Sequence, residues 1–86
     1  MQIRLIGRPA ILDNQGQARP IRGLQVWAVL ARVLLSRRPV ERRSLAADLF
    51  PDAQDPLAAL RWCLASLRRA LDAPQALTGD PIELNL

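Results

Sequence analysis

The sequence predicts an α+β domain in which a small antiparallel sheet is followed by three helices and a C-terminal β-hairpin. Three observations carry this prediction: short alternating segments at both ends, a nearly all-apolar run over residues 24–36, and an amphipathic segment over residues 55–72. With 86 residues, of which half are hydrophobic, the chain is expected to form a single domain, 1–86, with one core.

Residues 1–22 are predicted to form the sheet, whose role is to cover the helices. The first residues alternate polar and apolar side chains, as a half-buried strand does. Pro9 cannot donate to a central ladder, so a second strand should begin just after it. Asp13, Asn14 and Gly16 form a turn cluster of the kind that joins antiparallel strands. The predicted strands span residues 2–6, 10–12 and 18–21.

The segment 24–36 is predicted to be a helix in the middle of the core, because apolar residues lie on nearly all of its sides. Gly23 marks its start, and Pro39 disfavours helix at the residue before it. Arg37 and Arg38 follow the helix and are expected to stay solvated. The predicted inward-facing set is Trp27, Leu30, Ala31 and Leu34.

A second, shorter helix is predicted over residues 42–49, packed by Leu45 and Leu49 and followed by a connecting loop. Arg42 and Arg43 stand at its start, where the free N–H groups of a helix attract phosphate. These two arginines are therefore predicted to anchor a phosphate backbone.

The third predicted helix, 55–72, has the clearest signals. Asp55 is an N-cap residue and Pro56 fits the first helical position. Leucines then recur at steps of three and four residues, which places them in one stripe on the helix. These leucines are Leu57, Leu60, Leu64, Leu67 and Leu71.

The opposite face of this helix carries Trp62 and Arg69, and Arg61 and Arg68 flank the stripe. An arginine fork matches both guanine acceptors and phosphate oxygens, so Arg69, which lies furthest outward, is the strongest candidate for a base contact. Arg68 either reaches phosphate or packs its stem on the core. Trp62 has three alternatives: contact with thymine methyls or deoxyribose, contact with a partner chain, or packing on the loop near Pro51.

Residues 75–86 are predicted to form a hairpin, since Ile82, Leu84 and Leu86 alternate with polar residues and 78–81 has turn composition. The order of strands, three helices and a hairpin is that of a winged helix-turn-helix.

Composition narrows the possible functions. The net charge is +4 and all twelve basic residues are arginine, which favours a polyanion partner, although a GC-rich genome is an alternative origin of the arginine bias. One cysteine, Cys63, and no histidine exclude a disulfide framework and Cys/His metal sites. There is no histidine base, nucleophile elbow or phosphate-binding glycine loop, so we expect no enzyme activity and no cofactor. Without a secretory or membrane-spanning pattern, the chain is expected to be cytoplasmic.

Four segments carry a family resemblance: GLQVWAVLARVLL, VERRSLAADLFPDA, DPLAALRWCLASLRRALD and LTGDPIELNL. They resemble the N-terminal winged-helix domain of SARP-type (BTAD-containing) bacterial transcriptional activators, which is similar to the effector domain of OmpR/PhoB-type response regulators. The resemblance implies gene regulation, with the helix over 55–71 in the major groove of double-stranded DNA and the hairpin as a wing. It also implies that these residues belong to a longer regulator, or a truncated relative, that can form a homodimer.

Two features differ from the family pattern. Family recognition helices commonly carry a basic residue where this chain has Ser66, and the predicted wing contains Asp80 and Glu83 but no arginine. Both differences remove contacts with DNA and predict weaker duplex binding. The alternative function is a protein interaction or dimerisation module that uses the Trp62 face. The candidate DNA-binding residues are Arg42, Arg43, Arg61, Trp62, Ser66, Arg68 and Arg69.

Overall fold

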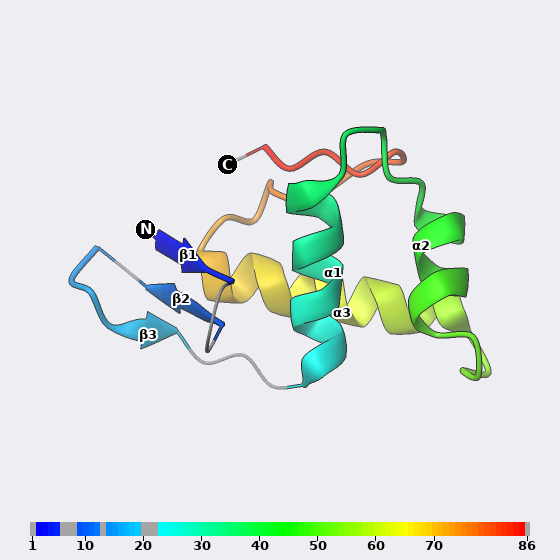
Figure 1. Cartoon of the computed structure of the whole chain (residues 1–86), viewed down its shortest axis with the longest axis horizontal. Coiled ribbons are helices and arrows are strands. Elements are labelled where there is room, and N and C mark those ends of the chain that lie inside the picture. Colours follow the sequence, from blue (N-terminus) through cyan, green and yellow to red (C-terminus); the bar gives the residue numbers. More distant parts are fainter. Residues whose placement is uncertain (1, 6–8, 13, 20–22, 86) are drawn as a thin grey trace.

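The computed structural model describes residues 2–5, 9–12, 14–19 and 23–85 and shows an α+β arrangement, with strands first and helices after them (Figure 1). The strands lie at one end of the molecule, beside the C-terminal half of the longest helix (Figure 1). The elements are β1 (Gln2–Arg4), β2 (Ala10–Leu12), β3 (Ala18–Arg19), α1 (Leu24–Leu35), α2 (Arg42–Leu49) and α3 (Pro56–Leu71).

The sheet is antiparallel, with the order β1-β2-β3. Ile3 pairs with Ile11, and the Ile11 side chain is fully buried, so the sheet closes one side of the core. The prediction of three short antiparallel strands is confirmed for these residues. Parts of the predicted strands and of their turns, at positions 6, 13, 20 and 21, lie outside the described residues.

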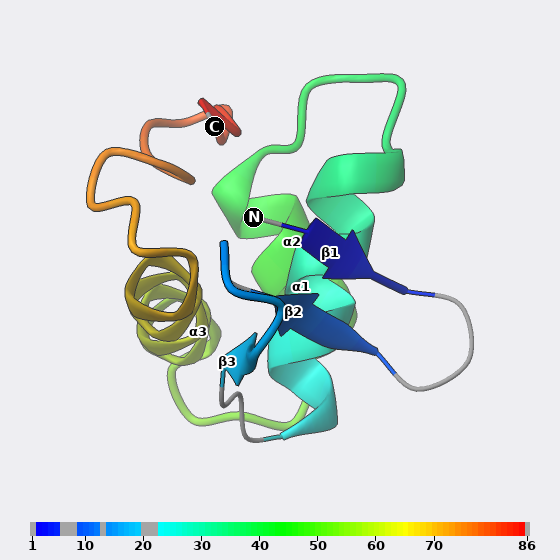
Figure 2. The same ribbon diagram turned by 90° about the vertical axis from the view of Figure 1, so that its left-hand side faces the viewer.

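Helix α1 ends one residue earlier than predicted, with Ser36 as its C-cap. Its predicted inward-facing set is confirmed in part. Leu30 is buried, and Trp27 and Leu34 are half-buried and pack against the core, whereas Ala31 lies outside the core cluster. Val26 and Val29, which were not predicted, are fully buried. The physical reason is that α2 and α3 pack against one side of α1, so an apolar helix that was expected at the centre has a second side without cover (Figure 2).

Helices α2 and α3 have the bounds that the sequence predicts, to within one residue at each end. The Asp55 side chain caps α3 by accepting a hydrogen bond from the Ala58 amide at 3.1 Å. Asp72 ends the helix in the left-handed conformation, with φ of 52°. Four leucines of the predicted stripe are buried, and the fifth, Leu57, is half-buried. The buried ones are Leu60, Leu64, Leu67 and Leu71.

The C-terminal segment folds as a turn with isolated bridges, where the sequence predicts a hairpin over 75–86. Thr78 pairs with Glu83, and the Glu83 amide donates to the Thr78 carbonyl at 2.8 Å. The Ile82 amide instead donates to the carbonyl of Val40, in the connection between α1 and α2, at 2.8 Å. The second arm of the expected hairpin thus pairs with two different segments, Ile82 with Val40 and Glu83 with Thr78. No strand forms in residues 75–85, the part of the expected hairpin that the structure describes.

The three helices form two sides of the molecule. When the molecule is viewed along α3, this helix lies toward one edge, and α1 and α2 both lie on the side of α3 that faces the middle of the molecule (Figure 2). None of the described helices is long and apolar enough to cross a lipid bilayer.

Candidate nucleic-acid interface

The outward side of α3 is the largest group of predicted site residues that the structure brings together. Arg61 and Arg69 are exposed, Trp62 is 59% exposed, and Ser66 is half-buried. Trp62, Ser66 and Arg69 lie opposite the buried leucines because their spacing along the helix places them on the other side of the wheel, and Arg61 lies at the edge of this side, where it flanks the leucine stripe. We call this surface the α3 face; its members are Arg61, Trp62, Ser66 and Arg69.

Two of these side chains contact each other. Arg69 Nη2 donates to the Ser66 hydroxyl at 3.4 Å, so the guanidinium lies along the helix surface. The Arg61 guanidinium makes no hydrogen bond or ion pair with the described residues. An arginine without a protein partner keeps all its donors for a ligand.

The exposure of Trp62 bears on its three predicted roles. The indole is 59% exposed and is absent from the apolar cluster that surrounds the core, so most of the ring faces solvent. Contact with DNA and contact with a partner chain are the two roles that an exposed ring can fill.

Arg68 belongs to the scaffold. Its Nη1 donates to the carbonyl of Leu77 at 3.0 Å in a partly buried position. The guanidinium is thus bonded within the chain. This agrees with the second predicted role of Arg68, packing, rather than with phosphate contact. This bond ties α3 to the C-terminal segment.

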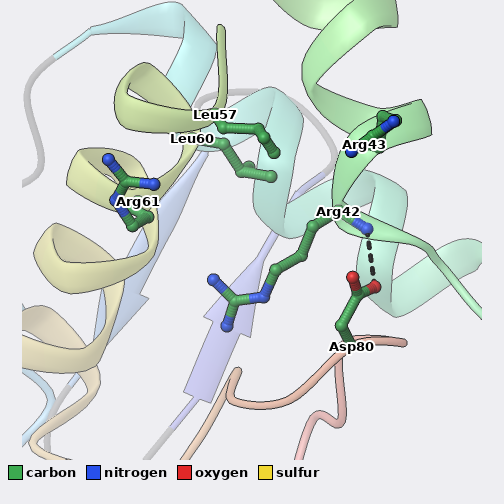
Figure 3. Close-up of a pocket in the computed structure, with 6 residues that line it drawn as sticks. All are labelled: Arg42, Arg43, Leu57, Leu60, Arg61 and Asp80. Atoms are coloured by element: carbon green, nitrogen blue, oxygen red, sulfur yellow. Dashed lines mark hydrogen bonds between the residues drawn. The ribbon is translucent and has the colours of Figure 1, made fainter. Parts of the chain in front are cut away.

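Arg42 is likewise engaged within the chain. Its backbone amide donates to Asp80 Oδ1 at 3.0 Å (Figure 3). Its Nε donates to the Gly79 carbonyl at 2.7 Å. Glu41, the N-cap residue of α2, makes no side-chain cap, and Asp80, 38 positions after Arg42 in the chain, supplies one instead. The carboxylate occupies one of the amides that would otherwise attract phosphate at this helix start.

The start of α2 and the N-terminal half of α3 enclose a hollow of about 210 Å³ next to the C-terminal turn (Figure 3). Three arginines and one carboxylate line it, which leaves it positively charged. The sequence placed Arg42 and Arg43 on one helix and Arg61 on another, and no local pattern indicated that they share a cavity. The lining residues are Arg42, Arg43, Leu57, Leu60, Arg61 and Asp80.

Sequence reasoning missed two further contacts. Asp80 was assigned only to a turn, and its bond to Arg42 spans too much chain for any local pattern to signal. Arg32 Nη2 and Asp48 Oδ2 form an ion pair at 3.1 Å between α1 and α2. This pair has no recognisable sequence signal either, since its partners lie on different helices.

Cys63 is buried, as predicted, and burial raises the pKa of its thiol by disfavouring the thiolate. Among the described residues, no group of three acidic, cysteine or histidine side chains is arranged to hold a metal ion.

No protein-family model, curated protein or solved structure matches this chain. Its function must be inferred from its own residues and from the geometry of the α3 face.

Proposed function

We propose that the chain is a winged-helix DNA-binding domain of a bacterial transcriptional regulator, acting in the cytoplasm, in which α3 enters the major groove of double-stranded DNA. The observation that carries this proposal is the division of α3. One side buries leucines in the core, and the other presents exposed arginines at the edge of the molecule. The resemblance to SARP-type and OmpR/PhoB-type domains supports it, and so does the order of sheet, three helices and C-terminal turn.

The spacing of the α3 face suits a duplex. Arg61 and Arg69 are eight positions apart, which corresponds to about 12 Å along a helix. That distance spans about three to four base pairs at a rise of about 3.4 Å each. Two arginine forks at this separation reach guanine edges or phosphates, while Ser66 offers a hydroxyl and Trp62 an apolar surface for a thymine methyl or a sugar.

The hollow beside α2 is the proposed backbone contact. Arg43 is exposed and its guanidinium has no partner among the described residues, and the Arg42 side chain enters the hollow. Asp80 opposes a phosphate here because it already holds the Arg42 amide and adds a negative charge. We therefore expect modest affinity that falls as salt rises, since few counterions are released.

Fluorescence anisotropy with a duplex selected from a random pool tests the proposal. We expect Arg61→Ala and Arg69→Ala each to weaken binding about tenfold or more, because a bidentate base contact contributes about 1–3 kcal/mol. Arg37→Ala is the matched control: it removes the same charge from the α1–α2 connection, which lies across the molecule from α3 (Figure 2). We expect it to change the affinity less than about twofold at physiological salt.

Two results would contradict the proposal. One is no duplex binding even at low salt. The other is equal weakening by all three substitutions, which would indicate nonspecific attraction to a cationic protein. Selection from the pool would then recover no common sequence.

The exposure of Trp62 supports a second candidate function, a protein interaction or dimerisation module that uses the α3 face. Trp62→Ala distinguishes the two functions. In the interaction module, the substitution abolishes self-association, measured by analytical ultracentrifugation, and leaves nucleic-acid binding unaffected. In the DNA-binding domain, it weakens duplex binding and leaves the oligomeric state unchanged.

A further inference from the structure

Helix α1 carries an apolar surface that packing within the chain does not explain. Four apolar residues follow one another at steps of four, three and four positions, which aligns them along one side of the helix. Leu24 is 84% exposed and Leu35 is 73% exposed, and the two alanines between them are half-buried. We call this surface the α1 stripe; its members are Leu24, Ala28, Ala31 and Leu35.

The stripe lies opposite the side of α1 that faces the core. Val26, Val29 and Leu30 are buried against the other helices, and the stripe is turned away from them by about half a turn. In the end-on view of α3, the outer side of α1 and the outer side of α3 lie on opposite sides of the molecule (Figure 2). DNA bound to the α3 face would therefore leave the stripe free.

The shape of the stripe suits a partner helix. Small residues between two leucines let another backbone approach closely, and the leucines flank it. At the C-terminal end of the stripe lies a hollow of about 230 Å³, lined by Ala31, Arg32, Leu35 and Ser36. A hollow of this size can accept an apolar side chain of the partner.

Charge selects the kind of partner. Arg37 and Arg38 are exposed just beyond the end of α1, and their guanidinium groups have no partner among the described residues. Arg32 is paired with Asp48, and α1 itself contains no acidic residue. Among the described residues, no acidic side chain pairs with Arg37 or Arg38 at this end of the stripe.

A second copy of the chain does not meet this requirement. Parallel packing of two stripes would bring the arginine pairs together, and antiparallel packing would place them beside a helix start that lacks acidic residues. Each copy also has a net charge of +4. The complementary surface is an apolar helix that carries carboxylates.

We propose that the α1 stripe, with Arg37 and Arg38 at its end, is the docking site for an acidic amphipathic helix of another protein. Leucine-type side chains of that helix pack between Leu24 and Leu35, and its carboxylates pair with the two arginines. This site is independent of the α3 face, so the proposal holds whether or not the chain binds DNA.

A synthetic peptide tests the proposal. The probe is an acetylated and amidated peptide of roughly 16 residues, or about four helical turns, with leucines at helical spacing and glutamates on both flanks. Its matched control has lysine in place of each glutamate. Titration into the full chain, followed by isothermal calorimetry and by amide shifts in NMR spectra, should show the acidic peptide binding about tenfold tighter or more than the basic one.

Two variants locate the site. Leu35→Gln should weaken binding of the acidic peptide about tenfold, because it removes an apolar contact at the hollow. Arg37→Glu combined with Arg38→Glu should abolish the preference for the acidic peptide over the basic one. Trp62→Ala, on the opposite side of the molecule, should leave both affinities unchanged. Since all four residues are exposed, these variants keep the fold, and circular dichroism verifies this.

Three outcomes would overturn the proposal. The first is equal binding of the acidic and basic peptides. The second is amide shifts that map to the α3 face. The third is concentration-dependent dimerisation of the chain that Leu35→Gln abolishes, which would identify a second copy as the occupant.

Discussion

Helices α1 and α3 are both rich in leucine, yet they use it differently. Helix α3 buries its leucines along one side and exposes arginines on the other. Helix α1 is apolar almost all round, buries one side, and leaves Leu24 and Leu35 in solvent. The comparison shows that the two helices present chemically different surfaces to solvent, one with exposed arginines and the other with exposed leucines. These surfaces are the basis of the two proposals, DNA on α3 and a helix of another protein on α1.

The largest expected difference in stability is between the same substitution, leucine to alanine, at a buried position of α3 and at an exposed position of α1. Leu64→Ala should lower the free energy of unfolding by about 2–5 kcal/mol, because it leaves a cavity in the core. Leu35→Ala should change it by less than about 0.5 kcal/mol, because the side chain is mostly in water already. Urea denaturation followed by circular dichroism measures both values.

The contrast between these two variants is itself informative. A loss of more than about 1 kcal/mol for Leu35→Ala would mean that the stripe is covered within the folded chain, and the docking proposal would lose its basis. A small loss for Leu64→Ala would mean that α3 does not carry the core.

A second comparison separates two adjacent arginines of α3. Arg68→Ala should lower the free energy of unfolding by about 1–3 kcal/mol, since it removes the donor to the Leu77 carbonyl and the packing of a partly buried stem. Arg69→Ala should cost less than about 0.5 kcal/mol, because the residue is exposed. Thermal unfolding of the two variants, measured side by side, decides whether the roles are divided in this way. Equal losses would contradict the division of α3 into a structural side and a binding side.

Periodicity explains how much of this fold the sequence could predict. The bounds of α2 and α3 and the buried side of α3 were predictable, because leucines at helical spacing define one direction and Asp55 and Pro56 define a start. The buried side of α1 was predictable only in part, because Gln25 and Arg32 are its only polar residues and most of its circumference is apolar. Only the positions of α2 and α3 decide which of its sides is buried.

The candidate site was predictable in part for a similar reason. The α3 face follows from helical geometry alone, so Trp62 and Arg69 were correctly placed outward. The hollow beside α2 depends on contacts between distant segments, such as the bond from the Arg42 amide to Asp80. Such contacts arise from the tertiary fold and leave no local pattern.

Helix starts provide a third and smaller comparison. Asp55→Ala should cost about 0.5–2 kcal/mol, because the Ala58 amide loses its acceptor. Helix α1 begins at Gly23 without a side-chain cap. Amide hydrogen exchange should therefore show the first turn of α1 exchanging faster than the first turn of α3 in the native chain, and at a similar rate in the Asp55→Ala variant. Protection of the first turn of α1 equal to that of α3 in the native chain would indicate an outer contact at Leu24.

The smallest expected effect is a loss of folding stability at alkaline pH. It tests how well the Cys63 side chain, on the core-facing side of α3, is shielded from solvent. Burial raises the pKa of the Cys63 thiol above its ordinary value of 9.0, so the folded chain holds this proton more tightly than the unfolded chain does. The resulting stability is present below pH 9.0 and is lost as pH rises through the raised pKa.

The composition of the chain lets a change in stability at alkaline pH be assigned to Cys63. The chain has no lysine, tyrosine or histidine, so Cys63 is the only side chain that titrates in the alkaline range below arginine. Urea denaturation at several alkaline pH values should show the native chain losing stability, whereas Cys63→Ala should have a nearly flat profile. Identical profiles would mean that the thiol is open to solvent, and the buried side of α3 would then be narrower than its leucines indicate.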